Sequence, residues 1–131
     1  MARIELDHVI ISARDKRAAA EKLAGLLGVP WGDARLGPFT GVYLNEGLTL
    51  DFYETDEPFP VEHFCFRVGS DAEFETILAR IKAAGIPYRS LVRGPVDYQV
   101  DTQFGGQGVY WNEPEGHQWE LLTVSYARQS P

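Results

Sequence analysis

Several residue types that mark specialised protein classes are scarce in this chain. It has one cysteine, Cys65, among 131 residues, so no disulfide can form within the chain and a reducing compartment fits. No apolar run approaches the roughly 18 residues that cross a bilayer. The N-terminal residues Met1–Glu5 lack the apolar stretch of a signal peptide. We therefore expect a cytoplasmic protein that makes no membrane contact.

Basic residues are also few. Lysine and arginine number 12 against 19 aspartates and glutamates, which gives a formal net charge of -7. A surface this acidic repels phosphate backbones, so we expect no nucleic-acid partner. What is present, 44% hydrophobic and 24% charged residues, is typical of a globular domain. A chain of this length can bury a core without disulfides.

The same order of elements is predicted twice, and the first half sets the pattern. Ile4–Ser12 is rich in β-branched residues and predicts a strand. An apolar stripe at helical spacing predicts a helix over 14–27, with Ser12 and Asp15 as its candidate start and Gly28–Pro30 as its stop. Short strands are then predicted at 34–36, 41–44 and 48–54, with a hairpin turn between the last two.

The second half repeats this order. Val61–Val68 predicts a strand, and the capping box Ser70-Asp71-Ala72-Glu73 predicts a helix that ends at Gly85–Pro87. Further strands are predicted at 88–92, 108–112 and 118–124, and 93–107 is predicted to be a loop that borders a site. A sheet of three or four strands with one helix has too little core alone. We therefore predict one α+β domain over residues 1–131, with module one at 1–56 and module two at 60–126.

A histidine and a carboxylate occupy matching places in the two halves. Alternation along the strands puts His8 and His63 on the face away from the helix, and it puts Asp51 and Glu120 on that face too. A curved sheet would bring the four side chains into one cavity. Imidazole and carboxylate together suit a divalent ion such as iron, manganese, nickel or zinc. Two histidines and one carboxylate leave positions open for a substrate.

Three segments resemble the vicinal-oxygen-chelate superfamily, the glyoxalase, bleomycin resistance protein and dioxygenase group. They are Leu6–Val9, Val61–Phe64 and Tyr110–Leu121. The last is similar to the family's Tyr-Phe-x-Asp-Pro-Asp-Gly-x-x-x-Glu-Leu hairpin, with Glu113 and Glu115 in place of the aspartates. The resemblance covers nearly the whole chain. It implies paired βαβββ modules forming a curved mixed sheet around a central metal cavity, assembly as a homodimer, and metal ligation by His8, His63 and Glu120.

The resemblance also suggests roles around the metal. Asp51 matches a fourth ligand position that holds Glu or Gln in glyoxalase I-like members. Because Asp is one methylene shorter, Asp51 is interpreted as a ligand, a group acting through water, or a base. Arg67 would bind a substrate carboxylate, or else pair with Asp51 or Glu120. Tyr53 and Tyr110 are the other candidates for substrate binding, or else they line the core. His117 is predicted to be a surface turn residue, and Cys65 is predicted to be a small buried apolar residue rather than a nucleophile.

The resemblance implies a metal-dependent enzyme whose small-molecule substrate chelates the metal through neighbouring oxygens. Glu120 and Asp51 are the candidate catalytic groups, and lyase or isomerase chemistry follows if Asp51 ligates. Three protein ligands with iron(II) would instead permit extradiol-type dioxygenase chemistry, which usually occurs in longer chains. Fosfomycin-inactivating transferases are less similar, because Ile10 stands where they carry threonine. The rival hypothesis is a metal-free drug- or metabolite-binding protein of the bleomycin-resistance type, which generally lacks the three ligands.

Overall fold

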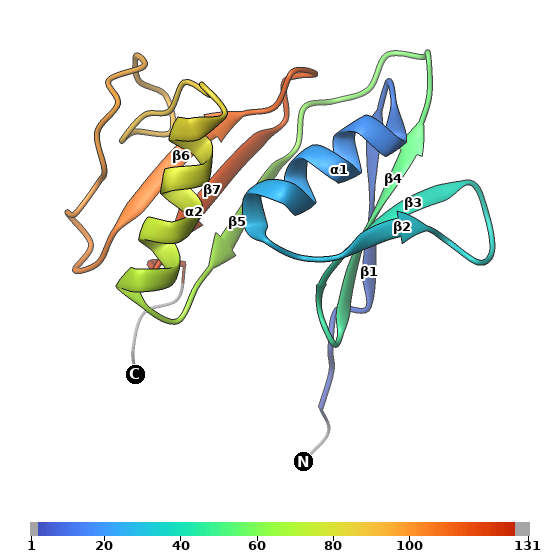
Figure 1. Cartoon of the computed structure of the whole chain (residues 1–131), viewed down its shortest axis with the longest axis horizontal. Coiled ribbons are helices and arrows are strands. Elements are labelled where there is room, and N and C mark those ends of the chain that lie inside the picture. The colour runs from blue at the N-terminus through green and yellow to red at the C-terminus, as the bar shows by residue number, and fades with distance from the viewer. Residues whose placement is uncertain (1–2, 128–131) are drawn as a thin grey trace. The chain divides into compact units, whose positions relative to one another are not determined.

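The computed structural model describes residues 3–127, and the chain divides into two units, 1–60 and 61–131 (Figure 1). Each unit opens with a strand, continues with a helix and ends with further strands, as the doubled order predicts. The α+β class is thereby confirmed. Residues 1–2 and 128–131 of the predicted domain lie outside the described residues, and the shared core of the two modules stays a prediction.

The first unit is a four-stranded mixed sheet with one helix. The sheet order is β1-β4-β3-β2; β1 runs parallel to β4, and the other neighbours are antiparallel. The helix packs on this sheet. The elements are β1 (His8–Ala13), α1 (Lys16–Leu27), β2 (Trp31–Asp33), β3 (Phe39–Asn45) and β4 (Leu48–Glu54).

The helix of the first unit starts later than predicted. Strand β1 continues through Ser12, so Asp15 is the cap instead, and its side chain accepts a hydrogen bond from Ala18 N at 3.0 Å. The predicted stop is confirmed, because Gly28 adopts the left-handed conformation at φ 75°. Ile11 and Phe52 are fully buried. These residues form the helix-facing core, as the alternation predicts.

The second unit is a three-stranded mixed sheet with one helix. The order is β5-β7-β6, with β5 parallel to β7 and β6 antiparallel to it. Ser70 Oγ accepts from Glu73 N at 3.2 Å, which confirms the capping box. Within residues 3–127, no helix is long and apolar enough to cross a membrane. The elements are β5 (His63–Arg67), α2 (Asp71–Ala83), β6 (Gly108–Asn112) and β7 (Gln118–Leu122).

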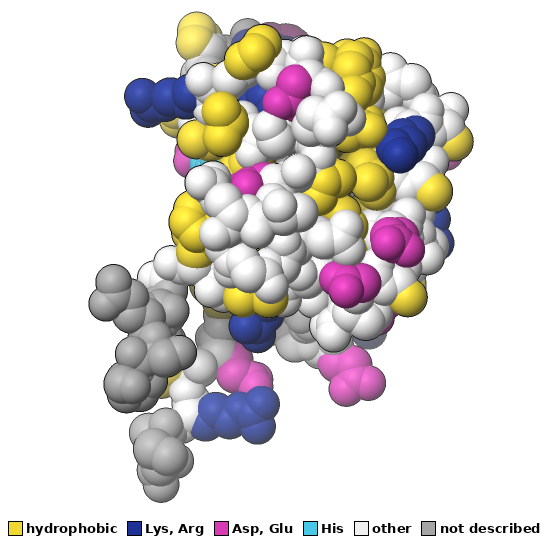
Figure 2. All heavy atoms as spheres, turned by 90° about the vertical axis from the view of Figure 1, so that its left-hand side faces the viewer, with side chains coloured by type: hydrophobic (Ala, Val, Ile, Leu, Met, Phe, Trp, Pro, Cys, Tyr) yellow, Lys and Arg dark blue, Asp and Glu magenta, His cyan; other side chains and the backbone are white. Residues whose placement is uncertain are grey.

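Two predicted strands are wrong. The first was expected at 34–36, but Trp31 and Gly32 make the pairing with β3. In the segment 88–92, only Arg89 pairs with β6, through a single bridge to Tyr110. The chain then turns away, because Ser90 N and Oγ both donate to Asp97. Figure 2 shows apolar side chains exposed on the face that carries this loop; those of the loop are Leu91, Val92, Val96, Tyr98 and Phe104.

Candidate functional site

The two units place a histidine and a carboxylate in equivalent register. In the first unit, Asp51 on β4 stands two residues beyond the residue that pairs with His8. In the second unit, Glu120 on β7 stands two residues beyond the residue that pairs with His63. Both strand pairs are parallel. The predicted equivalence of Asp51 and Glu120 is therefore confirmed.

Glu120 is a buried carboxylate with two different hydrogen-bond partners. The residue is 1% exposed. Its Oε1 lies 3.1 Å from Nε2 of His63, and its Oε2 accepts a hydrogen bond from the Tyr126 hydroxyl at 2.5 Å. Among residues 3–127, no lysine or arginine forms an ion pair with it. Burying an ionised carboxylate is costly unless a cation or several donors compensate, so this position favours an added cation.

His63 faces Glu120 with one ring nitrogen and Gln118 with the other. The distance from Nδ1 to Oε1 of Gln118 is 3.2 Å, and the side chain of His63 is 41% exposed. In the tautomer that carries its hydrogen on Nδ1, the ring donates to the Gln118 amide oxygen. The lone pair of Nε2 is then free for a metal bound beside Glu120, which is the arrangement that metal-binding histidines usually show. In the other tautomer Nε2 carries the hydrogen and donates it to Oε1 of Glu120.

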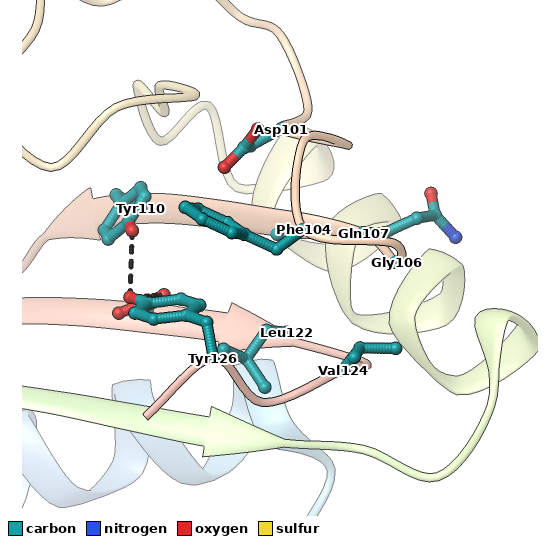
Figure 3. Close-up of a pocket in the computed structure, with 10 residues that line it drawn as sticks. Asp101, Phe104, Gly106, Gln107, Tyr110, Leu122, Val124 and Tyr126 are labelled. Atoms are coloured by element: carbon teal, nitrogen blue, oxygen red, sulfur yellow. Dashed lines mark hydrogen bonds between the residues drawn. The ribbon is translucent and has the colours of Figure 1, made fainter. Parts of the chain in front are cut away.

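Two tyrosines extend the hydrogen-bond chain from Glu120. The hydroxyl groups of Tyr126 and Tyr110 are 3.1 Å apart, and Figure 3 shows them meeting below β6. Burial raises the pKa of the Tyr110 phenol. The Phe104 ring lies 4.8 Å from the Tyr126 ring, centre to centre. A cavity of about 10 Å³ beside this group has room for about one water molecule.

A larger open pocket lies on the same side of the second unit. Its volume is about 380 Å³, and its lining includes His63, Cys65 and Arg67 from β5. The predicted common face of these three residues is thereby confirmed. Arg67 forms no ion pair within residues 3–127, so its predicted pairing with a carboxylate is not seen there. Glu120, Leu122, Ser125, Tyr126 and Ala127 complete the lining.

Cys65 opens onto this pocket rather than lying in the core. Its partial burial raises the pKa of the thiol to about 12, and the neighbouring charge of Glu120 adds to the rise. The thiolate is the nucleophilic form of cysteine. Cys65 is therefore a poor nucleophile at neutral pH, as predicted, whereas the predicted burial is wrong because the residue is exposed.

The first unit holds the other predicted site residues. His8 is exposed, and its Nδ1 lies 2.7 Å from Oδ2 of Asp7. That hydrogen bond raises the pKa of His8, and the charge of Asp51 raises it further. Asp51 is half-buried. Tyr53 is 40% exposed and packs its ring against Phe39. Within residues 3–127, neither unit by itself gathers three His, Cys, Asp or Glu side chains around one position.

Sequence reasoning missed three contributors to the second unit's site. Gln118 shares a strand face with Glu120, so alternation would have found it. No local pattern marks Tyr126 or Phe104, which come from segments outside the regular strands. The prediction for His117 is wrong: the residue is fully buried. Its Nδ1 accepts a hydrogen bond from Glu62 N at 2.9 Å, which ties the turn to the start of β5.

Comparisons with known proteins give matches among solved structures. No protein-family model matches the sequence, and no curated protein does. The structure of Oxidase ChaP-H1 shares 36% identity at a TM-score of 0.88, over 96% of this chain and 100% of that chain. Oxidase ChaP-H2 shares 32% identity at a TM-score of 0.89, over 98% and 100%. A lactoylglutathione lyase from Agrobacterium tumefaciens shares the fold, with 18% identity and a TM-score of 0.68 over 94% and 96%.

Proposed function

Because the chain belongs to the vicinal-oxygen-chelate superfamily, we propose that it is a divalent-metal-dependent oxidase. Its substrate is a small organic molecule that offers two neighbouring oxygens to the metal, and dioxygen is the oxidant. The sequence favoured lyase or isomerase chemistry over oxygen-dependent chemistry. We reverse that order because two solved structures that share more than 30% identity with this chain are named oxidases.

One observation carries the proposal: the buried Glu120 carboxylate beside an imidazole nitrogen. Oε1 of Glu120 and Nε2 of His63 are 3.1 Å apart, and both are atom types that divalent first-row metals prefer. The pair lines an open pocket, so a substrate has access to it. The residues therefore fit a metal. His63 and Glu120 would hold it, and the family resemblance adds His8 as the third ligand.

When bound, the metal supplies Lewis acidity and, if it is iron, a redox centre for substrate and dioxygen. Around it, the chain's own groups have separate tasks. Gln118 holds the hydrogen of His63 on Nδ1 and so keeps Nε2 free to ligate. Glu120 carries the negative charge that offsets the cation. The Tyr110 hydroxyl lies next to this group, through Tyr126, and its contact with a substrate stays a prediction.

Arg67 suggests that the substrate carries an acidic group in addition to its two metal-chelating oxygens. It lines the same pocket as His63, four residues further along β5. Four strand residues span about 13 Å, so an acidic substrate group bound by Arg67 would lie at the opposite end from the chelating oxygens. A guanidinium binds carboxylates in a bidentate manner. We propose a substrate that is anionic and longer than a simple two-carbon chelator.

Oxygen uptake tests the proposal. Metal-free protein would be loaded with Fe²⁺ without air and then mixed with air-saturated catechols, α-hydroxy ketones or β-diketones, each with and without a carboxylate. We expect iron-dependent oxygen uptake with at least one class, loss of uptake in Glu120→Gln, and no change in Glu75→Gln, an exposed residue of α2. Iron-loaded protein that consumes no oxygen with any class, but isomerises or cleaves one of them, would move the assignment to the lyase or isomerase alternative.

The superfamily resemblance also implies a homodimer, which sedimentation at micromolar concentration would test.

The rival function is a metal-free binding protein. The pairing of His63 with Glu120 argues against this rival function. A buried carboxylate without a cation lowers stability, and a pocket that only binds an organic ligand has no need of it.

A further inference from the structure

We propose that Tyr126 is a positioning residue for Glu120: it occupies Oε2 and so leaves Oε1 to face the metal beside His63. The inference rests on the proposed metal-dependent function and adds a residue to it. Tyr126 lies beyond the last strand, four residues after β7 ends at Leu122. Its hydroxyl reaches back to Oε2 of Glu120 at 2.5 Å.

The hydrogen bonds along this chain have a defined direction. An ionised carboxylate can only accept, so the Tyr126 hydroxyl donates to Glu120. A phenol has one hydrogen, so the contact of 3.1 Å between Tyr126 and Tyr110 must use the hydrogen of Tyr110. The Tyr126 hydroxyl that donates to Oε2 of Glu120 is thereby fixed in turn by a hydrogen bond from Tyr110. Oε1 faces the His63 ring nitrogen at 3.1 Å instead, so the two oxygens are not equivalent.

The surrounding packing fixes where the Tyr126 hydroxyl lies. The Phe104 and Tyr126 rings lie 4.8 Å apart, tilted by 32°, and Figure 3 shows the two rings side by side. The segment that leads to Tyr126 is tied to the loop before β6 by two hydrogen bonds. Gln107 N donates to Thr123 Oγ1 at 2.9 Å, and Thr123 N donates to Gln107 O at 3.0 Å. The phenol is therefore held at both the ring and the backbone.

This arrangement makes a specific prediction for Tyr126→Phe. The variant keeps the ring that packs on Phe104 and removes only the donor to Oε2. The Glu120 carboxylate then turns freely and is able to offer both oxygens to one metal ion. We expect metal affinity to fall about 10–100-fold, which is the range for groups that orient a ligand. The coordination of the bound ion should change as well.

Cobalt titration measures both effects without any substrate. Metal-free wild type, Tyr126→Phe, Tyr98→Phe and Glu120→Gln would each be titrated with Co²⁺, with calorimetry for affinity and visible absorption for coordination. Tyr98 is the matched control, because it is a half-exposed tyrosine that packs on Tyr88. Thermal unfolding of each metal-free protein checks the fold. We expect Tyr126→Phe to bind Co²⁺ weakly with a shifted spectrum, and Tyr98→Phe to match the wild type.

The outcomes separate the two proposals. If Glu120→Gln loses Co²⁺ while Tyr126→Phe keeps wild-type affinity and spectrum, the positioning role is wrong and the proposed metal site stands. If Glu120→Gln binds Co²⁺ as the wild type does, or the wild type does not bind it, the metal site is wrong and the role of Tyr126 falls with it. If Tyr126→Phe fails to fold, Tyr110→Phe decides: a shifted Co²⁺ spectrum supports the hydrogen-bond chain, and an unchanged spectrum overturns it.

Discussion

His63 and Glu120 are 57 positions apart in the chain, yet Nε2 of the one and Oε1 of the other are 3.1 Å apart. The parallel pairing of β5 and β7 produces this contact, because Cys65 is the direct partner of Glu120 and His63 lies two residues before it on the same face. A strand pair within one unit thus brings together two of the three proposed metal ligands. The first unit has the same register but a shorter carboxylate, Asp51.

The role of Asp51 determines whether the proposed metal has three or four protein ligands. His8 hydrogen-bonds to Asp7, and the charge of Asp51 acts on His8. We expect Asp51→Asn to weaken metal binding by about 10–100-fold, as loss of an orienting group does. Calorimetry against His63→Ala checks this. A loss equal to that of His63→Ala would make Asp51 a direct ligand and would favour the lyase or isomerase alternative.

Gly106 allows the loop before β6 to approach the segment that carries Tyr126. A Cβ at this position would lie 2.5 Å from Thr123 Oγ1 and 2.7 Å from a methyl carbon of Val124. We expect Gly106→Ala to lower the free energy of unfolding by about 1–3 kcal/mol, the cost of overpacking, and to weaken metal binding. Urea unfolding and Co²⁺ titration measure the two effects.

Gly25 is the matched control for that variant. It lies inside α1, and a Cβ there meets nothing within 4 Å. Alanine at an exposed helix interior position is favoured over glycine by about 0.5–1 kcal/mol, so Gly25→Ala should stabilise the fold and leave Co²⁺ affinity unchanged. Equal destabilisation by both substitutions would contradict the close approach at Gly106.

The buried imidazole of His117 is a structural group. It accepts from Glu62 N at 2.9 Å and lies against the Trp119 ring. We expect His117→Ala to lower the free energy of unfolding by about 2–5 kcal/mol, because it leaves a cavity and an unpaired amide. His8→Ala, at an exposed imidazole, should change it by less than about 0.5 kcal/mol. Denaturant unfolding of the metal-free proteins makes the comparison, and similar small effects in both would refute the structural role.

Glu113 gives a pH-dependent test. Burial raises the pKa of its carboxyl group above the ordinary value of 4.5, and Glu115 adds to the rise. The folded chain therefore keeps this proton after the unfolded chain has released it, so stability falls as pH rises through that interval. Gln can still accept from His117 N without the charge. We expect Glu113→Gln to gain stability relative to wild type between about pH 3 and about pH 7. A difference that does not change with pH would contradict the raised pKa.

Local patterns predicted much of this fold. Alternation placed Arg67 with His63 and Cys65 on the pocket side, and the glycine stop of α1 and the capping box of α2 were both predicted from adjacent residues. The strand expected at 88–92 does not form. Instead, the backbone N–H and the hydroxyl of Ser90 both donate hydrogen bonds to Asp97, seven residues away. A propensity for extended backbone cannot reveal such a side-chain competitor.

The positions of Tyr126 and His117 could not be predicted from the sequence, and the physical reason is the same for both. Tyr126 reaches Glu120 because Thr123 is hydrogen-bonded to Gln107, a contact between segments 16 positions apart. Similarly, His117 is buried because its turn meets Glu62, 55 positions away. Tertiary contacts of this kind leave no periodic trace in either segment. Repeat and alternation therefore predicted the proposed ligands, whereas the groups that hold them required the structure.

The metal content of the purified protein tests the central claim most directly. Protein prepared without added metal would be analysed for ion identity and amount, alongside His63→Ala, Glu120→Gln and the surface control Glu75→Gln. We expect about one divalent ion per chain in wild type and Glu75→Gln, as a mononuclear site requires, and a loss of most of it in the two site variants while both stay folded. Metal-free wild-type protein that takes up no Fe²⁺, Mn²⁺, Ni²⁺ or Zn²⁺, or equal metal content in all four proteins, would contradict the claim.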